Sequence, residues 1–123
     1  SDHEEEPVTE ANCLFCKIVA GEIPSDTVHE DELVYAFNDI NPMAPVHQLV
    51  IPRQHIASAD DLTEADAELL GRVFAVTASL AAAAGLPDKG YRVVTNVGAD
   101  AGQSVDHLHF HLLGGRAMTW PPG

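Results

Sequence analysis

The residues best suited to catalysis or metal binding are three histidines at alternate positions, His107, His109 and His111, which are separated by large apolar residues. Successive side chains of a β-strand point to opposite faces. The spacing therefore predicts a strand over His107–Leu113, with a row of imidazoles on one face and an apolar row toward the core. Because burying several imidazoles without partners is costly, we expect the row to line an accessible site.

This pattern is compatible with three kinds of surface. The histidines could be scattered on a bland exposed strand, although strict alternation with three large apolar residues disfavours that reading. They could hold zinc or iron, since imidazole is the commonest metal ligand. They could also perform nucleophilic catalysis, in which one imidazole attacks an electrophile while its neighbours position or protonate the other groups. The strand alone leaves the last two open.

A glycine-rich loop, 96–104, runs toward this strand and ends in Gly102, Gln103 and Ser104. Glycine permits close approach of a ligand to the backbone, and consecutive N–H groups in such a turn can bind an anion. The Ser104 hydroxyl could donate to a phosphate oxygen or a leaving group. Its position three residues before the first histidine makes the loop a candidate phosphate cradle.

A second constellation is the pair Cys13 and Cys16. One Cys-x-x-Cys motif is compatible with redox chemistry, zinc binding or two buried thiols. His55 and His107 on other elements could complete a Cys₂His₂ tetrahedron, which would be a closed structural zinc site.

Length and charge restrict the function further. A chain of 123 residues with 46% hydrophobic residues fits one globular domain. We assign 12–123 to this domain and 1–11 to a disordered acidic tail. The net charge of −13 argues against DNA or RNA as a partner. The absence of a long apolar run argues against a membrane span, and the acidic N-terminus differs from a secretory signal, which favours a cytoplasmic location.

The remaining elements predict an α+β fold with a mainly antiparallel sheet. We expect a short helix from the cap Asn12 to about Val19, a hairpin over 27–29 and 33–37, and strands over 47–51 and 91–95. Thr63 and Asp66 resemble a capping box that opens a long helix ending near Ala84. Its apolar stripe should face the core and comprises Leu69, Val73, Val76 and Leu80, widened by Leu70 and Phe74.

The stretch His107–Leu113 resembles the His-φ-His-φ-His-φ-φ signature of the histidine triad (HIT) superfamily of nucleotide hydrolases and transferases, where φ is an apolar residue. The likeness extends over roughly residue 12 to the end. The motifs that resemble the Hint branch of that family are Phe15-x-Lys17-Ile18, Glu22-Ile23-Pro24, Ala36-Phe37-x-Asp39-Ile40, Ala44-Pro45-x-His47, Val50-Ile51-Pro52-x-x-His55-Ile56, Gly102-Gln103-Ser104-Val105, Leu113-Gly114-Gly115-Arg116 and Trp120-Pro121-Pro122-Gly123.

The resemblance implies a HIT fold, with a five-stranded antiparallel sheet and one long and one short helix, that forms a homodimer. It implies a hydrolase of purine nucleoside phosphoramidates, or of related acyl derivatives, that releases a nucleoside monophosphate. His109 would be the nucleophile and form a nucleotidyl-histidine intermediate. His111, His47 and Ser104 would assist at the phosphate and the leaving group, without a catalytic divalent cation.

The same resemblance assigns the binding residues. Asp39 would accept hydrogen bonds from the ribose hydroxyls, and Trp120 would reach the site of the partner protomer. The purine would lie in an apolar clamp, and the phosphate would meet the loop before the triad; these residues are Phe15, Ile18, Ile23, Phe37 and Ile40, and Asn96, Gly102, Gln103, Ser104 and Val105. The implied zinc ligands are Cys13, Cys16, His55 and His107. A nucleotide-binding module with incidental turnover is the alternative.

Overall fold

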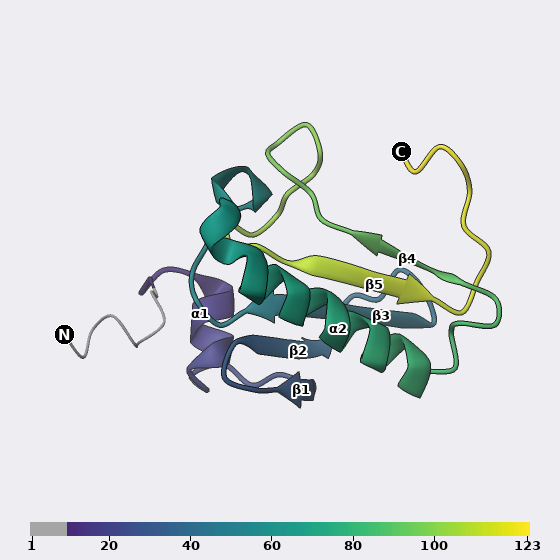
Figure 1. Cartoon of the computed structure of the whole chain (residues 1–123), viewed down its shortest axis with the longest axis horizontal. Helices are drawn as coiled ribbons and strands as arrows, with labels where there is room; N and C mark the ends of the chain where they lie inside the picture. Colours follow the sequence, from purple (N-terminus) through teal and green to yellow (C-terminus); the bar gives the residue numbers. More distant parts are fainter. Residues whose placement is uncertain (1–9) are drawn as a thin grey trace.

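The computed structural model describes residues 10–123 and shows one antiparallel sheet between two helical layers (Figure 1). Most of the predicted acidic tail lies outside the described residues. The strands pair in the order β1-β2-β3-β5-β4, and every pairing is antiparallel, which confirms the predicted α+β fold. The elements are α1 (Leu14–Val19), β1 (Thr27–Glu30), β2 (Val34–Asn38), β3 (Val46–Pro52), η2 (Ala59–Asp61), η3 (Glu64–Asp66), α2 (Ala67–Ala83), β4 (Tyr91–Val94) and β5 (Phe110–Gly114).

The central strands are covered on both faces. Along β2, Val34 and Ala36 pack under α2, whereas Tyr35 and Phe37 pack against α1 on the opposite face. This alternation follows from the two-residue period of a strand. The α2 layer of the core is built from Val34, Ala36, Val50, Ile56, Leu69, Val73, Val76, Leu108 and Phe110, and the α1 layer from Cys13, Phe15, Cys16, Ile18, Tyr35, Phe37, Leu49 and Ile51.

The start of the long helix differs from the prediction only in detail. Thr63 and Asp66 form the predicted capping box, but the first turn they close is the 3-10 turn η3, and α2 follows it. Three residues of the predicted stripe, Leu69, Val73 and Val76, are buried. Phe74 was expected to widen the buried stripe, but it is 51% exposed, although its ring packs against that of Phe110 with the centroids 5.5 Å apart.

Two other boundaries correct the sequence analysis. The N-cap of α1 is Cys13 rather than Asn12, because the Cys13 sulfur accepts the Cys16 N–H at 3.2 Å. The strand β5 begins at Phe110 instead of His107. Pro52 on the neighbouring strand has no N–H to extend the ladder, and the Leu108 N–H bonds to the Ile56 carbonyl instead.

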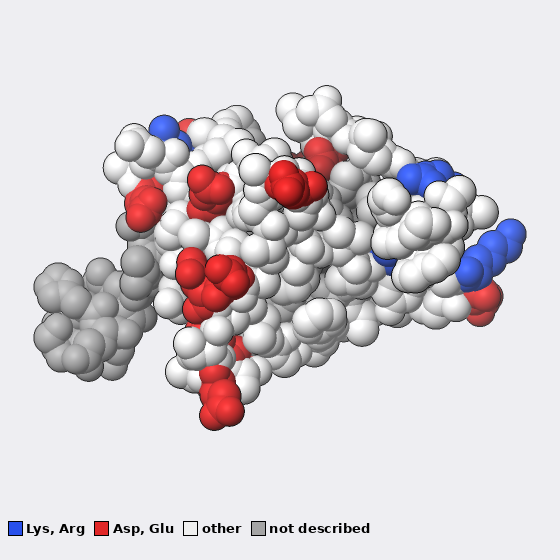
Figure 2. Space-filling view, turned by 90° about the horizontal axis from the view of Figure 1, so that it is seen from above, with Lys and Arg blue, Asp and Glu red and all other residues white. Residues whose placement is uncertain are grey.

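The charge on the surface matches the acidic composition of the chain. In Figure 2 acidic side chains are spread over the face that is shown, and most of the Lys and Arg side chains in this view lie at one end of the molecule. This face therefore offers no continuous basic track for a polyphosphate backbone. Within residues 10–123 no helix is both long and apolar enough to cross a membrane.

Candidate active site and metal centre

A cavity of about 700 Å³ opens between α1, the segment 23–26 before β1, the end of β2 and the residues around the start of β5. This volume lies in the range of sites that hold small molecules. Its walls are mainly apolar, and its polar lining includes Asp39 and His111, whose ligating atoms lie close together, as well as His109 and Ser104. The lining residues are Leu14, Phe15, Ile18, Ile23, Pro24, Ser25, Asp26, Phe37, Asn38, Asp39, Ile40, Leu49, Ser104, Val105, His109 and His111.

Most of the predicted nucleotide-binding residues line this cavity. Four do not: Asn96, Gly102, Gln103 and Trp120, the last of which is 82% exposed in the single chain. Sequence analysis missed Leu14, Pro24, Ser25, Asp26, Asn38 and Leu49. Leu49 could have been found, since it lies two residues after His47 and therefore on the same face of β3.

His109 is held with one ring nitrogen engaged and the other available. Its Nδ1 lies 2.7 Å from the carbonyl oxygen of His107. A carbonyl can only accept, so Nδ1 carries the proton and Nε2 keeps its lone pair. The carbonyl of His109 accepts a bond from the Thr95 hydroxyl at 2.8 Å. The ring is 3% exposed and lines the cavity, which is the arrangement of an oriented nucleophile.

A chain of hydrogen bonds fixes the tautomers of the other two site histidines. The Met43 N–H donates to Nδ1 of His47 at 3.0 Å, so the proton of His47 lies on Nε2. This Nε2–H donates to Nδ1 of His111 at 2.9 Å. His111 therefore carries its own proton on Nε2, the remaining nitrogen, and can donate it to a bound ligand.

Burial keeps both rings of this chain neutral. Burial, together with the neighbouring His109 and His47, lowers the pKa of His111 to about 4, and the Asp39 carboxylate only partly opposes that shift. Burial also lowers the pKa of His47, although the Asp39 carboxylate opposes that shift. At pH 7 His111 is accordingly a neutral hydrogen-bond donor.

Asp39 connects this chain to the sugar-binding position predicted from sequence. One carboxylate oxygen accepts the Asn41 N–H at 2.8 Å, and the other lies 3.4 Å from Nε2 of His47. The side chains of Asp39, His47 and His111 are close enough to hold a cation. The bond from Met43 places a proton on Nε2 of His47, and this proton would point toward such an ion. The hydrogen bonds therefore favour a chain of neutral donors and acceptors over a metal site here.

The loop before the triad is less open to an anion than its glycines suggest. Gly98 and Gly102 have φ of 80° and 84°, which the turn requires. The N–H of Gly102 bonds to the Ala99 carbonyl at 3.0 Å, and that of Gln103 bonds to the Gly98 carbonyl at 3.1 Å. Of the predicted cradle, only the N–H and hydroxyl of Ser104 have no hydrogen-bond partner among residues 10–123.

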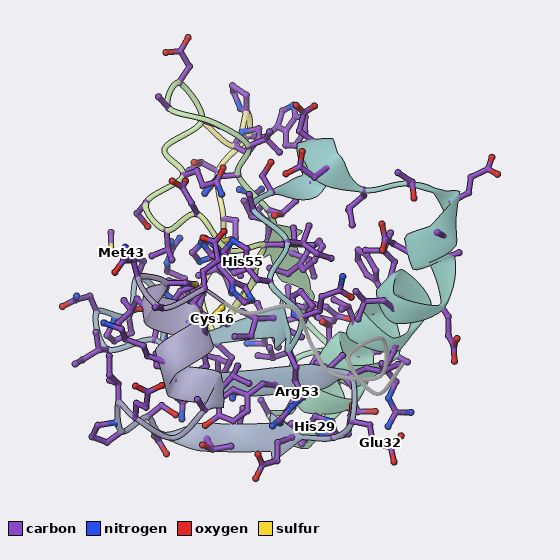
Figure 3. The ribbon with its side chains drawn as sticks, turned by 90° about the vertical axis from the view of Figure 1, so that its left-hand side faces the viewer. Cys16, His29, Glu32, Met43, Arg53 and His55 are labelled. Atoms are coloured by element: carbon purple, nitrogen blue, oxygen red, sulfur yellow. The ribbon has the colours of Figure 1, made fainter. Side chains whose placement is uncertain are left out.

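The second constellation assembles as expected from Cys13, Cys16, His55 and His107. The sulfur of Cys13 lies 3.3 Å from Nδ1 of His107, and the sulfur of Cys16 lies 3.4 Å and 3.5 Å from Nδ1 of His55 and His107. Tetrahedral zinc with its usual bond lengths requires a sulfur–nitrogen separation of about 3.5 Å. Figure 3 shows Cys16 on α1 with His55 close by.

The outer nitrogens of the two histidines are also arranged for a metal. Nε2 of His107 donates to the Pro52 carbonyl at 2.8 Å, and Nε2 of His55 lies 3.5 Å from the Glu10 carboxylate. Partners of this kind fix the tautomer that leaves Nδ1 free to ligate. The four residues thus fit a tetrahedral metal site in which no coordination position stays open. This also corrects the expectation that all three triad imidazoles line an accessible site, because His107 is fully buried in this cluster.

Comparison with known proteins agrees with this architecture. The HIT domain family matches residues 20–118, and the chain therefore belongs to that family. The chain is 51% identical over 110 residues to a HIT-like protein of Synechococcus elongatus, covering 89% of this chain and 96% of that protein. It is 50% identical over 112 residues to a 14 kDa zinc-binding protein of Zea mays, covering 89% and 87%.

The crystal structure of a HIT family hydrolase from Legionella pneumophila Philadelphia 1 superposes with a TM-score of 0.90. It has 54% sequence identity and covers 91% of this chain and 100% of that one. The fold and the family predicted from the triad are therefore confirmed. The chain is a HIT-domain protein similar to a HIT family hydrolase.

Proposed function

We propose that this protein is a hydrolase of purine nucleoside 5′-phosphoramidates, or of related nucleotidyl adducts, that releases the nucleoside monophosphate. The observation that carries the proposal is the pair of imidazoles, His109 and His111, that line one cavity with different ring nitrogens engaged. The ring of His109 keeps its Nε2 lone pair, and its centroid lies 5.1 Å from that of the His111 ring, which carries its proton on Nε2 and whose pKa burial lowers to about 4. A nucleophile and a donor are thereby ready at pH 7.

The reaction would proceed by two displacements at phosphorus. Nε2 of His109 attacks the α-phosphorus, the P–N bond breaks, and its electron pair leaves with the amine nitrogen, which takes a proton. Water then hydrolyses the nucleotidyl-histidine and regenerates the imidazole. His111, supported by His47, would donate to a phosphate oxygen throughout, and the hydrogen-bond chain supports a mechanism without a catalytic divalent cation.

The rest of the nucleotide would be recognised along the cavity. Asp39 would accept the ribose hydroxyls with the carboxylate oxygen that faces His47. The purine would lie between apolar side chains of α1 and β2, which include Phe15, Ile18 and Phe37. Ser104 would face the leaving group.

We also propose that the Cys₂His₂ cluster holds one structural zinc ion. The separations of its four ligands support this, as does the similarity to a zinc-binding protein of Zea mays. Four protein ligands leave no open position, so the ion would join α1 to the segments around His55 and His107 without activating water. Thiols committed to a metal in this way support the cytoplasmic location predicted above.

A homodimer completes the proposal. The strand β4 ends the sheet order and presents an unpaired edge, and two large side chains nearby, Phe74 and Tyr91, are exposed. Pairing of β4 with its copy would extend both sheets and cover this edge. The exposed Trp120 of one protomer would then be available to the site of the other. Light scattering after size exclusion measures the mass directly.

The decisive experiment is single-turnover incubation with adenosine 5′-phosphoramidate, followed by intact-protein mass spectrometry, on the wild type and His109→Ala. We expect AMP release through a transient adenylate adduct in the wild type and neither in the variant. The variant His29→Ala removes a histidine that belongs to neither centre, so it should still form the adduct and serves as the matched histidine control. AMP binding without adduct or turnover would favour a nucleotide-binding module instead.

A further inference from the structure

Gln103 has every polar group of its side chain engaged with the backbone. Its Oε1 accepts the Gly98 N–H at 2.9 Å, and its Nε2 donates to the carbonyls of Ala57 at 2.8 Å and Val105 at 3.1 Å. The side chain does not line the cavity. It has no group left for a nucleotide, although its position next to Ser104 suggests such a contact in the sequence.

These bonds enclose Ser104. The bond from Nε2 of Gln103 to the Val105 carbonyl joins the two residues that flank Ser104. The bond from the Gly98 N–H to Oε1 of Gln103 joins this end of the loop to its beginning. Ser104 and Val105 both line the cavity, whereas Gln103 does not. The backbone on both sides of Ser104 is thus held by its neighbour's amide.

The anchor at the far end is itself hydrogen-bonded to the segment that carries the histidines. Ala57 follows Ile56, whose carbonyl accepts the Leu108 N–H just before the nucleophile. Gln103 therefore ties the loop to the same backbone segment that holds the residues around His109. A hydrogen bond between a displaced hydroxyl and a leaving group weakens steeply with angle and distance, so this tie controls whether Ser104 can act.

We propose that Gln103 is a positioning residue, which holds the Ser104 hydroxyl on the leaving-group nitrogen as the P–N bond breaks. The bonding electrons move to that nitrogen, the Ser104 O–H donates a hydrogen bond to it, and a solvent proton completes the free amine. Gln103 itself touches neither nucleotide nor leaving group. This role rests on the proposed function and assigns it one further residue.

The test uses two adenosine substrates that differ only in the leaving group. One is an alkyl phosphoramidate, whose amine needs a donor, and the other is a 4-nitrophenyl phosphate ester, whose phenolate leaves without one. The variants are Gln103→Met, which keeps the size and removes the hydrogen bonds, Ser104→Ala, the double variant, and the loop control Asp100→Asn.

We expect Gln103→Met to lower kcat on the amidate by about 10- to 100-fold, less than the roughly 100- to 1,000-fold loss when such a donor is deleted, because the Ser104 hydroxyl itself remains. On the nitrophenyl ester it should change kcat by less than about 3-fold. The double variant should be no slower on the amidate than Ser104→Ala, because residues that act through one another are not additive. The Kd for AMP and the activity of Asp100→Asn should match the wild type.

Equal losses on both substrates, or additive losses in the double variant, would overturn the positioning role while leaving the hydrolase intact. A wild type that cleaves neither substrate would overturn the proposed function, and this role with it. Should Gln103→Met fail to fold, Gln103→Glu retains the acceptor for Gly98 and replaces only the donor. The same split between substrates is required of it.

Discussion

Replacing His111 by asparagine should make the stability of this protein less sensitive to mild acid. An exposed histidine titrates near pH 6.5, whereas burial beside His109 and His47 lowers the pKa of His111 to about 4. Between these values the folded chain binds fewer protons than the unfolded chain. The stability present at neutral pH is therefore lost as the pH falls through 6.5 toward 4.

The size of the effect follows from those two pKa values. Between pH 7.5 and pH 5, a shift from 6.5 to about 4 removes about 2 kcal/mol of unfolding free energy. Since the ring is only partly buried, solvent screening reduces the expected loss to about 1–2 kcal/mol. His111→Asn cannot titrate, so it should lose that much less than the wild type over this interval.

Urea unfolding followed by circular dichroism, at constant zinc concentration, gives the free energies by linear extrapolation. Between pH 7.5 and 9, where neither protein titrates at this position, the free energies of unfolding of the wild type and the variant should change with pH in parallel. An equal loss of stability in both proteins between pH 7.5 and 5 would show that His111 does not carry the shift.

Three other changes test separate parts of the structure. Cys16→Ser should abolish stoichiometric zinc measured by native mass spectrometry and lower Tm; undiminished zinc would refute the ligand assignment. For Asp31, bonds from an imidazole, a guanidinium and two N–H groups outweigh burial and hold the pKa below its usual range. Asp31→Asn should thus cost about 1–3 kcal/mol at pH 7 in chemical denaturation, and less at pH 3. Gly115→Ala should cost about 1–3 kcal/mol, because φ is 89° and its Cβ would lie 2.8 Å from Pro45. The control Gly98→Ala, with open space around it, should cost about 1 kcal/mol; equal losses would mean that the contact with Pro45 is harmless.

Much of the fold could be predicted because local patterns and the tertiary structure agree. Both faces of β2 are covered, so the side chains on both faces are apolar. The strand therefore appears in the sequence as a continuous apolar run. The capping box at Thr63 and Asp66 is a purely local device, and it formed as predicted. The faces of the triad were also right, since Leu108 and Phe110 pack in the α2 layer.

The errors arise where a distant backbone group decides the outcome. The start of β5 depends on a proline in another strand, and no periodicity within 107–113 contains that information. The N–H groups of the loop seemed free for phosphate because the sequence does not reveal that Gly98 and Ala99 accept two of them. The sequence likewise does not reveal that the amide of Gln103, which was predicted to bind nucleotide, bonds to the carbonyl of Ala57.

The same principle explains how three similar histidines acquire three roles. Their spacing puts them on one face, but the partner of each Nδ1 or Nε2 determines the nitrogen that remains available. Pro52 leaves Nδ1 of His107 for the cysteine cluster, the carbonyl of His107 leaves Nε2 of His109 for a substrate, and His47 leaves a proton on Nε2 of His111. His107 belongs to both centres, through its ring and through its carbonyl. A change that displaces the His107 backbone must therefore disturb His109 and the Cys₂His₂ cluster together, whereas removal of the His109 side chain should leave that cluster intact.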